Sequence, residues 1–124
     1  MDLNYVAITV HNIKDQLNFY TDKLGMQIKE RSCFSDKEYV KLEGGADQGT
    51  LMVFENRELG FRSTVILNTE DFLRDHYQLK ERGIKFLTEP EYTNVGLAAA
   101  FMDPAENYWI LLEERDYSDI NDEL

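Results

Sequence analysis

The chain contains the same short pattern twice, and this repeat limits the folds it can adopt more than any other feature. Each copy begins with an alternating apolar stretch, continues with a polar residue and a helical pattern, and ends at a glycine. The first copy runs from Tyr5 to Gly25, and the second runs from Thr64 to Gly83. Self-similarity within 124 residues predicts two halves that are built alike.

The spacing of apolar residues predicts the order strand, helix, strand, strand, strand in each half. Asn12 is the expected cap of the first helix and Gly25 its left-handed end, while Asp71 is the expected cap of the second helix. We expect the strands of the first half at residues 3–10, 26–33, 38–43 and 50–55. We expect those of the second half at residues 62–69, 84–88, 97–102 and 108–113, and residues 91–96 remain ambiguous.

Composition limits the domain organisation and the partners. We expect one domain over residues 1–114, with modules at 3–56 and 61–114, followed by an acidic tail at 115–124. The net charge of −11 argues against binding to nucleic acid or to an anionic membrane surface. The sequence has no apolar run near the ~20 residues that span a bilayer. A single cysteine, Cys33, suits a reducing compartment, so we expect a cytoplasmic protein.

Four stretches of the sequence resemble the vicinal oxygen chelate superfamily, which includes glyoxalases, bleomycin-resistance proteins and extradiol dioxygenases. They are residues 3–10, 19–25 and 79–83, and the turn Phe101-Met-Asp-Pro-Ala-Glu-Asn-Tyr108 before the last strand. The resemblance implies an α+β fold in which two βαβββ modules form a cupped, mixed eight-stranded sheet. It also implies helices on the outer side of the sheet, and usually a homodimer.

Metal-dependent members of that superfamily carry His or Glu at four positions that face the cavity. By resemblance these positions fall on Tyr5, Val53, Thr64 and Ile110. A catalytic metal needs about three ligands from His, Cys, Asp or Glu, and none of these four side chains qualifies. We therefore expect no metal, no other cofactor and no catalytic residues, which leaves enzyme activity uncertain and makes it the less favoured reading.

Strand alternation then indicates which side chains face the cavity. The candidate ligand-binding residues are Tyr5, Thr9, Val53, Thr64, Ile66, Asn68, Tyr108 and Ile110. Aromatic and apolar groups with a few hydroxyls and one amide suit a pocket for a small organic molecule. The same residues would also fit a filled second core or a dimer seam. His76 and Trp109 are expected to pack on the helix side of the sheet, and His11 to be exposed.

The leading interpretation is thus a metal-free small-molecule binding protein of the glyoxalase/bleomycin-resistance type. One alternative is a glyoxalase-like lyase or isomerase, or a dioxygenase, with a displaced metal site. A further alternative is a non-catalytic structural or regulatory dimer. A metal assay separates the enzyme from the other two, and stabilisation by a ligand separates a binding protein from a filled core.

Overall fold

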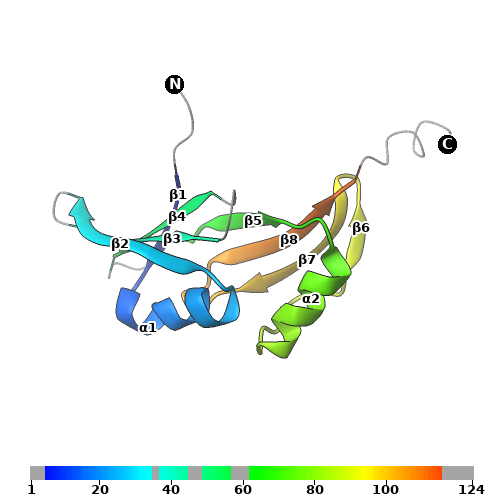
Figure 1. Cartoon of the computed structure of the whole chain (residues 1–124). Helices are drawn as coiled ribbons and strands as arrows, with labels where there is room; N and C mark the ends of the chain where they lie inside the picture. Colours follow the sequence, from blue (N-terminus) through cyan, green and yellow to red (C-terminus); the bar gives the residue numbers. More distant parts are fainter. Residues whose placement is uncertain (1–4, 35–36, 45–48, 57–61, 116–124) are drawn as a thin grey trace, which may run out of the picture. The chain divides into compact units, whose positions relative to one another are not determined.

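The computed structural model of the protein describes residues 5–34, 37–44, 49–56 and 62–115 (Figure 1). The chain divides into two compact units, Met1–Ser63 with Pro104–Asn107 and Thr64–Asp103 with Tyr108–Leu124. From residue 116 on, the predicted acidic tail lies outside the described residues. No helix among the described residues is long and apolar enough to cross a membrane.

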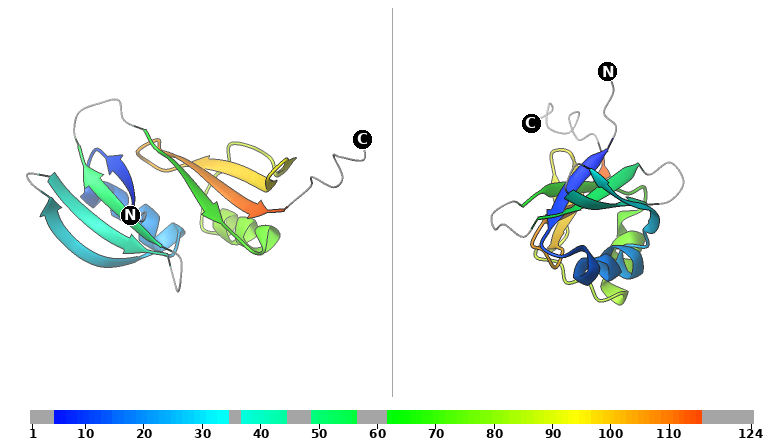
Figure 2. Two further views of the ribbon diagram at one scale, coloured as in Figure 1. Left: turned by 90° about the horizontal axis from the view of Figure 1, so that it is seen from above. Right: turned by 90° about the vertical axis from the view of Figure 1, so that its left-hand side faces the viewer.

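The first unit is one βαβββ module. Its elements are β1 (Val6–Val10), α1 (Ile13–Asn18), the π-helical turn η1 (Phe19–Lys23), β2 (Gln27–Phe34), β3 (Lys37–Glu43) and β4 (Thr50–Glu55). The sheet order is β1-β4-β3-β2, with β1 parallel to β4 and the other pairs antiparallel. In Figure 2 the helix lies against one face of this sheet.

The second unit repeats this architecture. Its elements are β5 (Thr64–Asn68), α2 (Phe72–Glu81), β6 (Glu91–Thr93), β7 (Gly96–Met102) and β8 (Tyr108–Glu114). The sheet order is β5-β8-β7-β6, and β5 is again the strand that runs parallel to its neighbour. The predicted α+β class and the two βαβββ modules are confirmed, with the eight strands shared between two sheets of four.

The helix ends have the predicted chemistry. The Asn12 side chain accepts a hydrogen bond from the backbone N–H of Asp15 at 3.3 Å, and Asp71 accepts one from Arg74 at 3.2 Å. These bonds satisfy donors that the first turn of a helix leaves unpaired. Gly25 has a positive φ of 73°, a conformation that glycine adopts without steric cost. The sequence signals for helix starts and stops are therefore sufficient here.

The core of each unit lies between its helix and its sheet. In the first unit, buried side chains of β1 and β3 alternate with more exposed ones and meet the buried face of α1, whereas on β4 Met52 is buried as well. The buried residues are Ile8, Val10, Ile13, Leu17, Tyr20, Val40, Leu42, Leu51 and Val53. This alternation follows from the two-residue period of a strand, which sends successive side chains to opposite faces.

A chain of aromatic rings fills the core of the second unit. The His76 ring lies 5.3 Å from that of Phe72 and 4.3 Å from that of Phe86, measured between centroids. Phe101 continues the chain, 5.4 Å from Phe86 and 6.1 Å from Trp109. Burial lowers the pKa of His76, and the positive charge of nearby Lys80 lowers it further. The predicted packing of His76 and Trp109 on the helix side is confirmed, and His11 is exposed as predicted.

The strand predicted at residues 84–88 is wrong. This segment makes an isolated bridge between Phe86 and Phe101, and the sixth strand is Glu91–Thr93 within the ambiguous stretch. Both segments lie along the same edge of β7, where Leu87 donates a backbone hydrogen bond to the carbonyl of Ala100 at 2.7 Å. Pro90 lacks an N–H and cannot extend a ladder between them.

Candidate functional site

Each sheet has one face that its helix does not cover, and most of the candidate site residues lie there. We call these the first and second helix-free faces. The first helix-free face includes Tyr5, Ala7, Thr9, Tyr39, Lys41, Met52 and Phe54. Strand register defines it, because Met52 lies opposite both Ala7 and Lys41, and Phe54 lies opposite Thr9 and Tyr39. Glu30 of β2 lies opposite Lys41, so this face combines aromatic rings with a lysine and a carboxylate.

Lys41 contacts two other polar side chains of the first helix-free face. Its Nζ donates a hydrogen bond to the Tyr5 hydroxyl at 3.0 Å and lies 4.5 Å from the centre of the Tyr5 ring. The same nitrogen lies 3.2 Å from a carboxylate oxygen of Glu30 on the neighbouring strand. The Tyr5 hydroxyl, followed by Glu30, raises the pKa of Lys41, so its ammonium group persists well above neutral pH.

The second helix-free face is a largely uncharged surface on β5, β7 and β8, with Glu114 at the end of β8. It also includes Thr64, Ile66, Asn68, Ala98, Ala100, Met102, Tyr108, Ile110 and Leu112. Register places Thr64 beside Tyr108 and Ile66 beside Ile110. Ile66 is 56% exposed and Met102 is 41% exposed, so apolar side chains present much of this surface to solvent. A surface of this kind suits the apolar body of an organic molecule.

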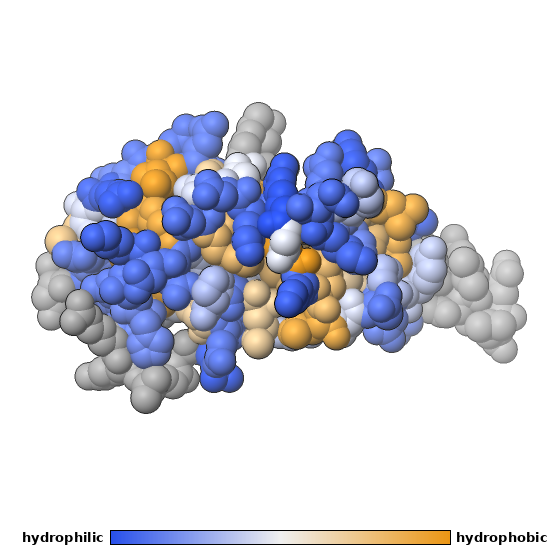
Figure 3. All heavy atoms as spheres, turned by 90° about the horizontal axis from the view of Figure 1, so that it is seen from below, coloured by the Kyte–Doolittle hydropathy of each residue, from blue (hydrophilic) through white to orange (hydrophobic). Residues whose placement is uncertain are grey.

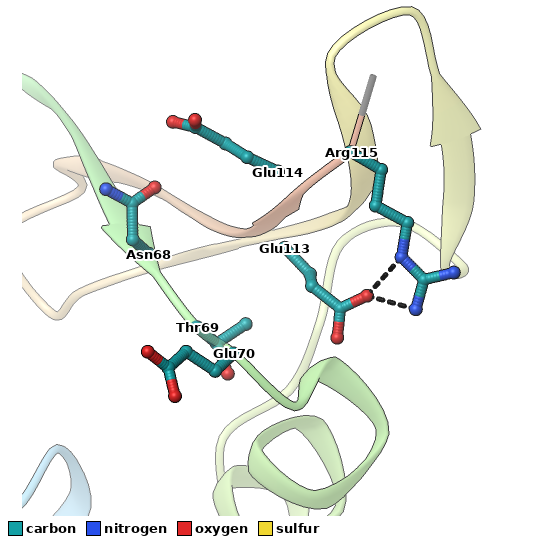
Figure 4. Close-up of a pocket in the computed structure, with 6 residues that line it drawn as sticks. All are labelled: Asn68, Thr69, Glu70, Glu113, Glu114 and Arg115. Carbon is teal, nitrogen blue, oxygen red and sulfur yellow. Dashed lines mark hydrogen bonds and ion pairs between the residues drawn. The ribbon is translucent and has the colours of Figure 1, made fainter. Parts of the chain in front are cut away.

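A polar hollow lies where β5 and β8 end. It is lined by Asn68, Thr69, Glu70, Glu113, Glu114 and Arg115 (Figure 4). The Glu113 carboxylate points toward Arg115 and forms an ion pair with it, whereas Glu114 points to the other side of the strand. The hollow thus places a predominantly acidic rim at one end of the second helix-free face, beside Asn68.

The structure brings together most of the residues predicted from sequence, within their own units. Thr64, Ile66, Asn68, Tyr108 and Ile110 share the second helix-free face. Tyr5 and Thr9 belong to the first helix-free face. Figure 3 shows a surface that is largely covered by hydrophilic side chains, with apolar ones in separate patches.

Val53 is the exception, and its predicted face is wrong. It pairs with Ile8 and is completely buried on the helix side of the first sheet. The residue that matches Ile110 is Met52, because Met52 pairs with Ala7 as Ile110 pairs with Ile66. A shift of one residue moves a strand side chain to the opposite face, so a register error of one inverts the assignment.

Lys41, Met52 and Phe54 were missed as site residues by sequence reasoning. Lys41 stands between Val40 and Leu42, which are both buried, so strand alternation alone indicates that it faces away from the core. Its contact with Tyr5 joins residues 36 positions apart in the sequence, and the local pattern carries no signal for that contact.

The superfamily's metal positions in this chain do not fit a divalent metal. With the register corrected they hold Tyr5, Met52, Thr64 and Ile110, and hard or borderline cations prefer imidazole and carboxylate ligands. Glu55, at the end of β4, lies on the helix side, where it accepts a hydrogen bond from Ile13 N at 3.1 Å. Within the described part of the chain, His, Cys, Asp and Glu nowhere gather in threes that could hold a metal.

The comparisons with known proteins agree with this class of fold. The sequence matches the model of the Glyoxalase/Bleomycin resistance protein/Dioxygenase superfamily over residues 2–111. The chain belongs to this superfamily, as the sequence resemblance predicts.

Individual relatives are distant. An uncharacterised protein from Shewanella frigidimarina (strain NCIMB 400) is 28% identical over 125 residues, which cover 90% of this chain and 93% of that protein. The crystal structure of UcmS2 matches with a TM-score of 0.79 at 18% identity, covering 92% of this chain and 98% of that one. The structure of TnmS3, an antibiotic-binding protein from Streptomyces sp. CB03234, matches with a TM-score of 0.75 at 21% identity. It covers 93% of this chain and 99% of that one.

Proposed function

We propose that this protein binds a small organic molecule on its helix-free sheet faces and that it does so without a metal ion. The main observation behind this proposal is that the second helix-free face exposes apolar side chains, among them Ile66 at 56%. Each 100 Å² of apolar surface that a ligand removes from water contributes about 2.5 kcal/mol. The thioether, hydroxyl and aliphatic groups at the superfamily's metal positions support binding rather than Lewis-acid chemistry.

The relatives support the same proposal. TnmS3, which resembles this chain in fold, is described as an antibiotic-binding protein. A structure of the bleomycin-binding protein with bleomycin also matches, with a TM-score of 0.72. Because the sequence identity to these proteins is low, the ligand of this chain has to be inferred from the residues of its two helix-free faces.

A thermal-shift screen tests this function directly. Protein dialysed against a chelator is melted in the presence of a library of amphipathic aromatic and aliphatic compounds. A ligand that binds the folded state at one hundred times its Kd stabilises it by about 2.7 kcal/mol. We expect such compounds to be found, with unchanged affinity when chelator is present. Binding that requires added divalent metal, or a complete lack of stabilising compounds, would contradict the proposal.

We also propose that the chain forms a homodimer. Several large apolar side chains are exposed in the described residues, among them Tyr92 at 72% and Val95 at 61%. Both edges of a sheet also offer unpaired backbone groups to a partner strand. A second copy of the chain would cover part of this apolar surface.

A further inference from the structure

We infer that the small molecule carries an anionic oxygen, as in a carboxylate, sulfonate or phenolate, and that Nζ of Lys41 binds it on the first helix-free face. This inference rests on the function proposed above and narrows its ligand class. It starts from the position of Lys41, a cation in the middle of β3 that lies between Met52 of β4 and Glu30 of β2.

The neighbours of Lys41 hold its amine in place. Its strand partner Met52 is only 9% exposed, and the Lys41 side chain itself is 22% exposed, so the aliphatic stem lies on apolar surface. The ammonium group then sits 4.5 Å from the centre of the Tyr5 ring and 3.0 Å from its hydroxyl oxygen. A lysine held in this way has lost rotamer freedom before a ligand arrives, which favours binding.

The contact with Tyr5 also selects against a cationic ligand on this face. An aromatic ring attracts a cation to its face, and Lys41 already fills that position on Tyr5. A ligand cation would have to displace Lys41 and would be repelled by it at close range. An anionic oxygen would instead gain a charge-assisted hydrogen bond from the same ammonium group.

Glu30 is the internal group that a ligand acid would replace. Its carboxylate lies 3.2 Å from Lys41 Nζ, and its side chain is 47% exposed. Glu30 is the solvent-exposed partner of this ion pair, so an incoming acid can replace it while Lys41 keeps an anionic partner. The rings of Tyr39 and Phe54, 5.6 Å apart, lie on the same face beside the Lys41–Met52 pair. They offer an aromatic surface for the body of the ligand.

Two fluorescent probes that differ by one charged group test the inference. Anilinonaphthalene sulfonate carries the anionic oxygens, and phenylnaphthylamine is the same ring system without the sulfonate. Both are titrated against the full chain and its variants. Lys41→Gln should weaken binding of the sulfonate at least about tenfold and leave the neutral probe within twofold of its parent affinity. Lys29→Gln is the matched control, because it removes an exposed charge from the adjacent strand of the same sheet.

A second variant removes the charge of Glu30, the carboxylate that competes with a ligand for Lys41. Glu30→Gln should tighten binding of the sulfonate severalfold, whereas Glu43→Gln, which changes the net charge equally, should have a smaller effect. Circular dichroism and melting curves check that each variant is folded. Equal sulfonate affinity in the parent and Lys41→Gln proteins would overturn the inference, as would an equal loss for both probes. If neither probe binds the parent protein, the inference is also wrong, while the library screen decides the proposed function separately.

Discussion

The carboxylate of Glu113 accepts a hydrogen bond from the backbone N–H of Phe72 at 3.0 Å, joining the last strand of the second unit to the start of its helix. The first unit contains the same relationship, because Glu55 accepts a hydrogen bond from Ile13 at 3.1 Å. Each carboxylate satisfies an unpaired donor at the positive end of a helix. The internal repeat therefore extends to a side chain that ties each helix to its sheet.

The pH dependence of folding stability should report the Glu113 contact. The hydrogen bond from Phe72 is the main cause that lowers the pKa of Glu113 below 4.5, and Arg115 adds to it. A carboxyl group whose pKa is lowered on folding stabilises the protein above its unfolded pKa, and this contribution is lost as the pH falls through the folded pKa. Glu113→Gln keeps an oxygen that can accept from Phe72 but loses the charge, so it should melt at a lower temperature than the parent at neutral pH.

Melting curves at a series of pH values check this prediction. The difference between Glu113→Gln and the parent should shrink as the pH falls below 4.5, the ordinary value of the group. Glu114→Gln removes the same charge from the next residue, whose side chain points to the other side of β8, and should lower the melting temperature less at neutral pH (Figure 4). A constant difference at all pH values would show that the Glu113 charge has no role in the contact.

Local sequence signals predicted much of the fold. The features that they did not predict depend on pairing between strands that are far apart in the sequence. Asn12 and Asp71 could be predicted as helix starts, because a capping side chain bonds to a residue only three positions further along the sequence. The face of Val53 depends on which residue of β1 lies beside it, and strand alternation does not set register between strands. The prediction of the sixth strand was wrong for a similar reason, since the pairing of residues 84–88 and 91–93 with different parts of β7 depends on contacts between strands.

The same distinction applies to the candidate site. Thr64 and Ile66 could be placed on one face from their spacing alone, and the register of β5 with β8 confirms that Tyr108 and Ile110 join them. The ion pair of Lys41 with Glu30 and its contact with the Tyr5 ring could not be predicted, because these side chains meet across strand pairs. The chemistry of the first helix-free face was therefore the part of the site that sequence left undetermined.

A buried hydrogen bond between Asp103 and Trp109 should stabilise the second unit. Trp109 Nε1 donates to Asp103 Oδ2 at 3.0 Å, and the two residues are 0% and 4% exposed, respectively. Asp103→Ala removes this acceptor from a buried donor and should cost about 1–3 kcal/mol in the free energy of unfolding. Asp103→Asn keeps a carbonyl oxygen and should cost less. Urea unfolding followed by fluorescence of the single tryptophan measures both variants.

A double-mutant cycle isolates that contact. Trp109→Phe removes the donor, so Asp103→Ala should cost less in the Trp109→Phe background than in the parent. Circular dichroism replaces fluorescence as the probe in this background. Additive effects of the two substitutions would mean that the hydrogen bond makes no net contribution.

Sedimentation should detect the proposed homodimer at twice the chain mass of 14.5 kDa. If association buries apolar surface, dilution should shift the protein toward a 14.5 kDa species and lower its melting temperature, because dimerisation stabilises the folded state by mass action. A single 14.5 kDa species throughout the micromolar range would contradict the proposal.

Tryptophan substitutions at two neighbouring residues should separate ligand binding from core packing. Thr64 is exposed on the second helix-free face, whereas Val65 is 8% exposed and points to the core. Thr64→Trp should block the face beside Tyr108 and weaken binding of a ligand from the screen at least about tenfold, with little change in stability. Val65→Trp overpacks the core and should cost about 1–3 kcal/mol in the free energy of unfolding. Calorimetric titration and urea unfolding of both variants give the comparison. If Thr64→Trp binds like the parent protein, the ligand lies elsewhere, and if it is as unstable as Val65→Trp, this face is packed core.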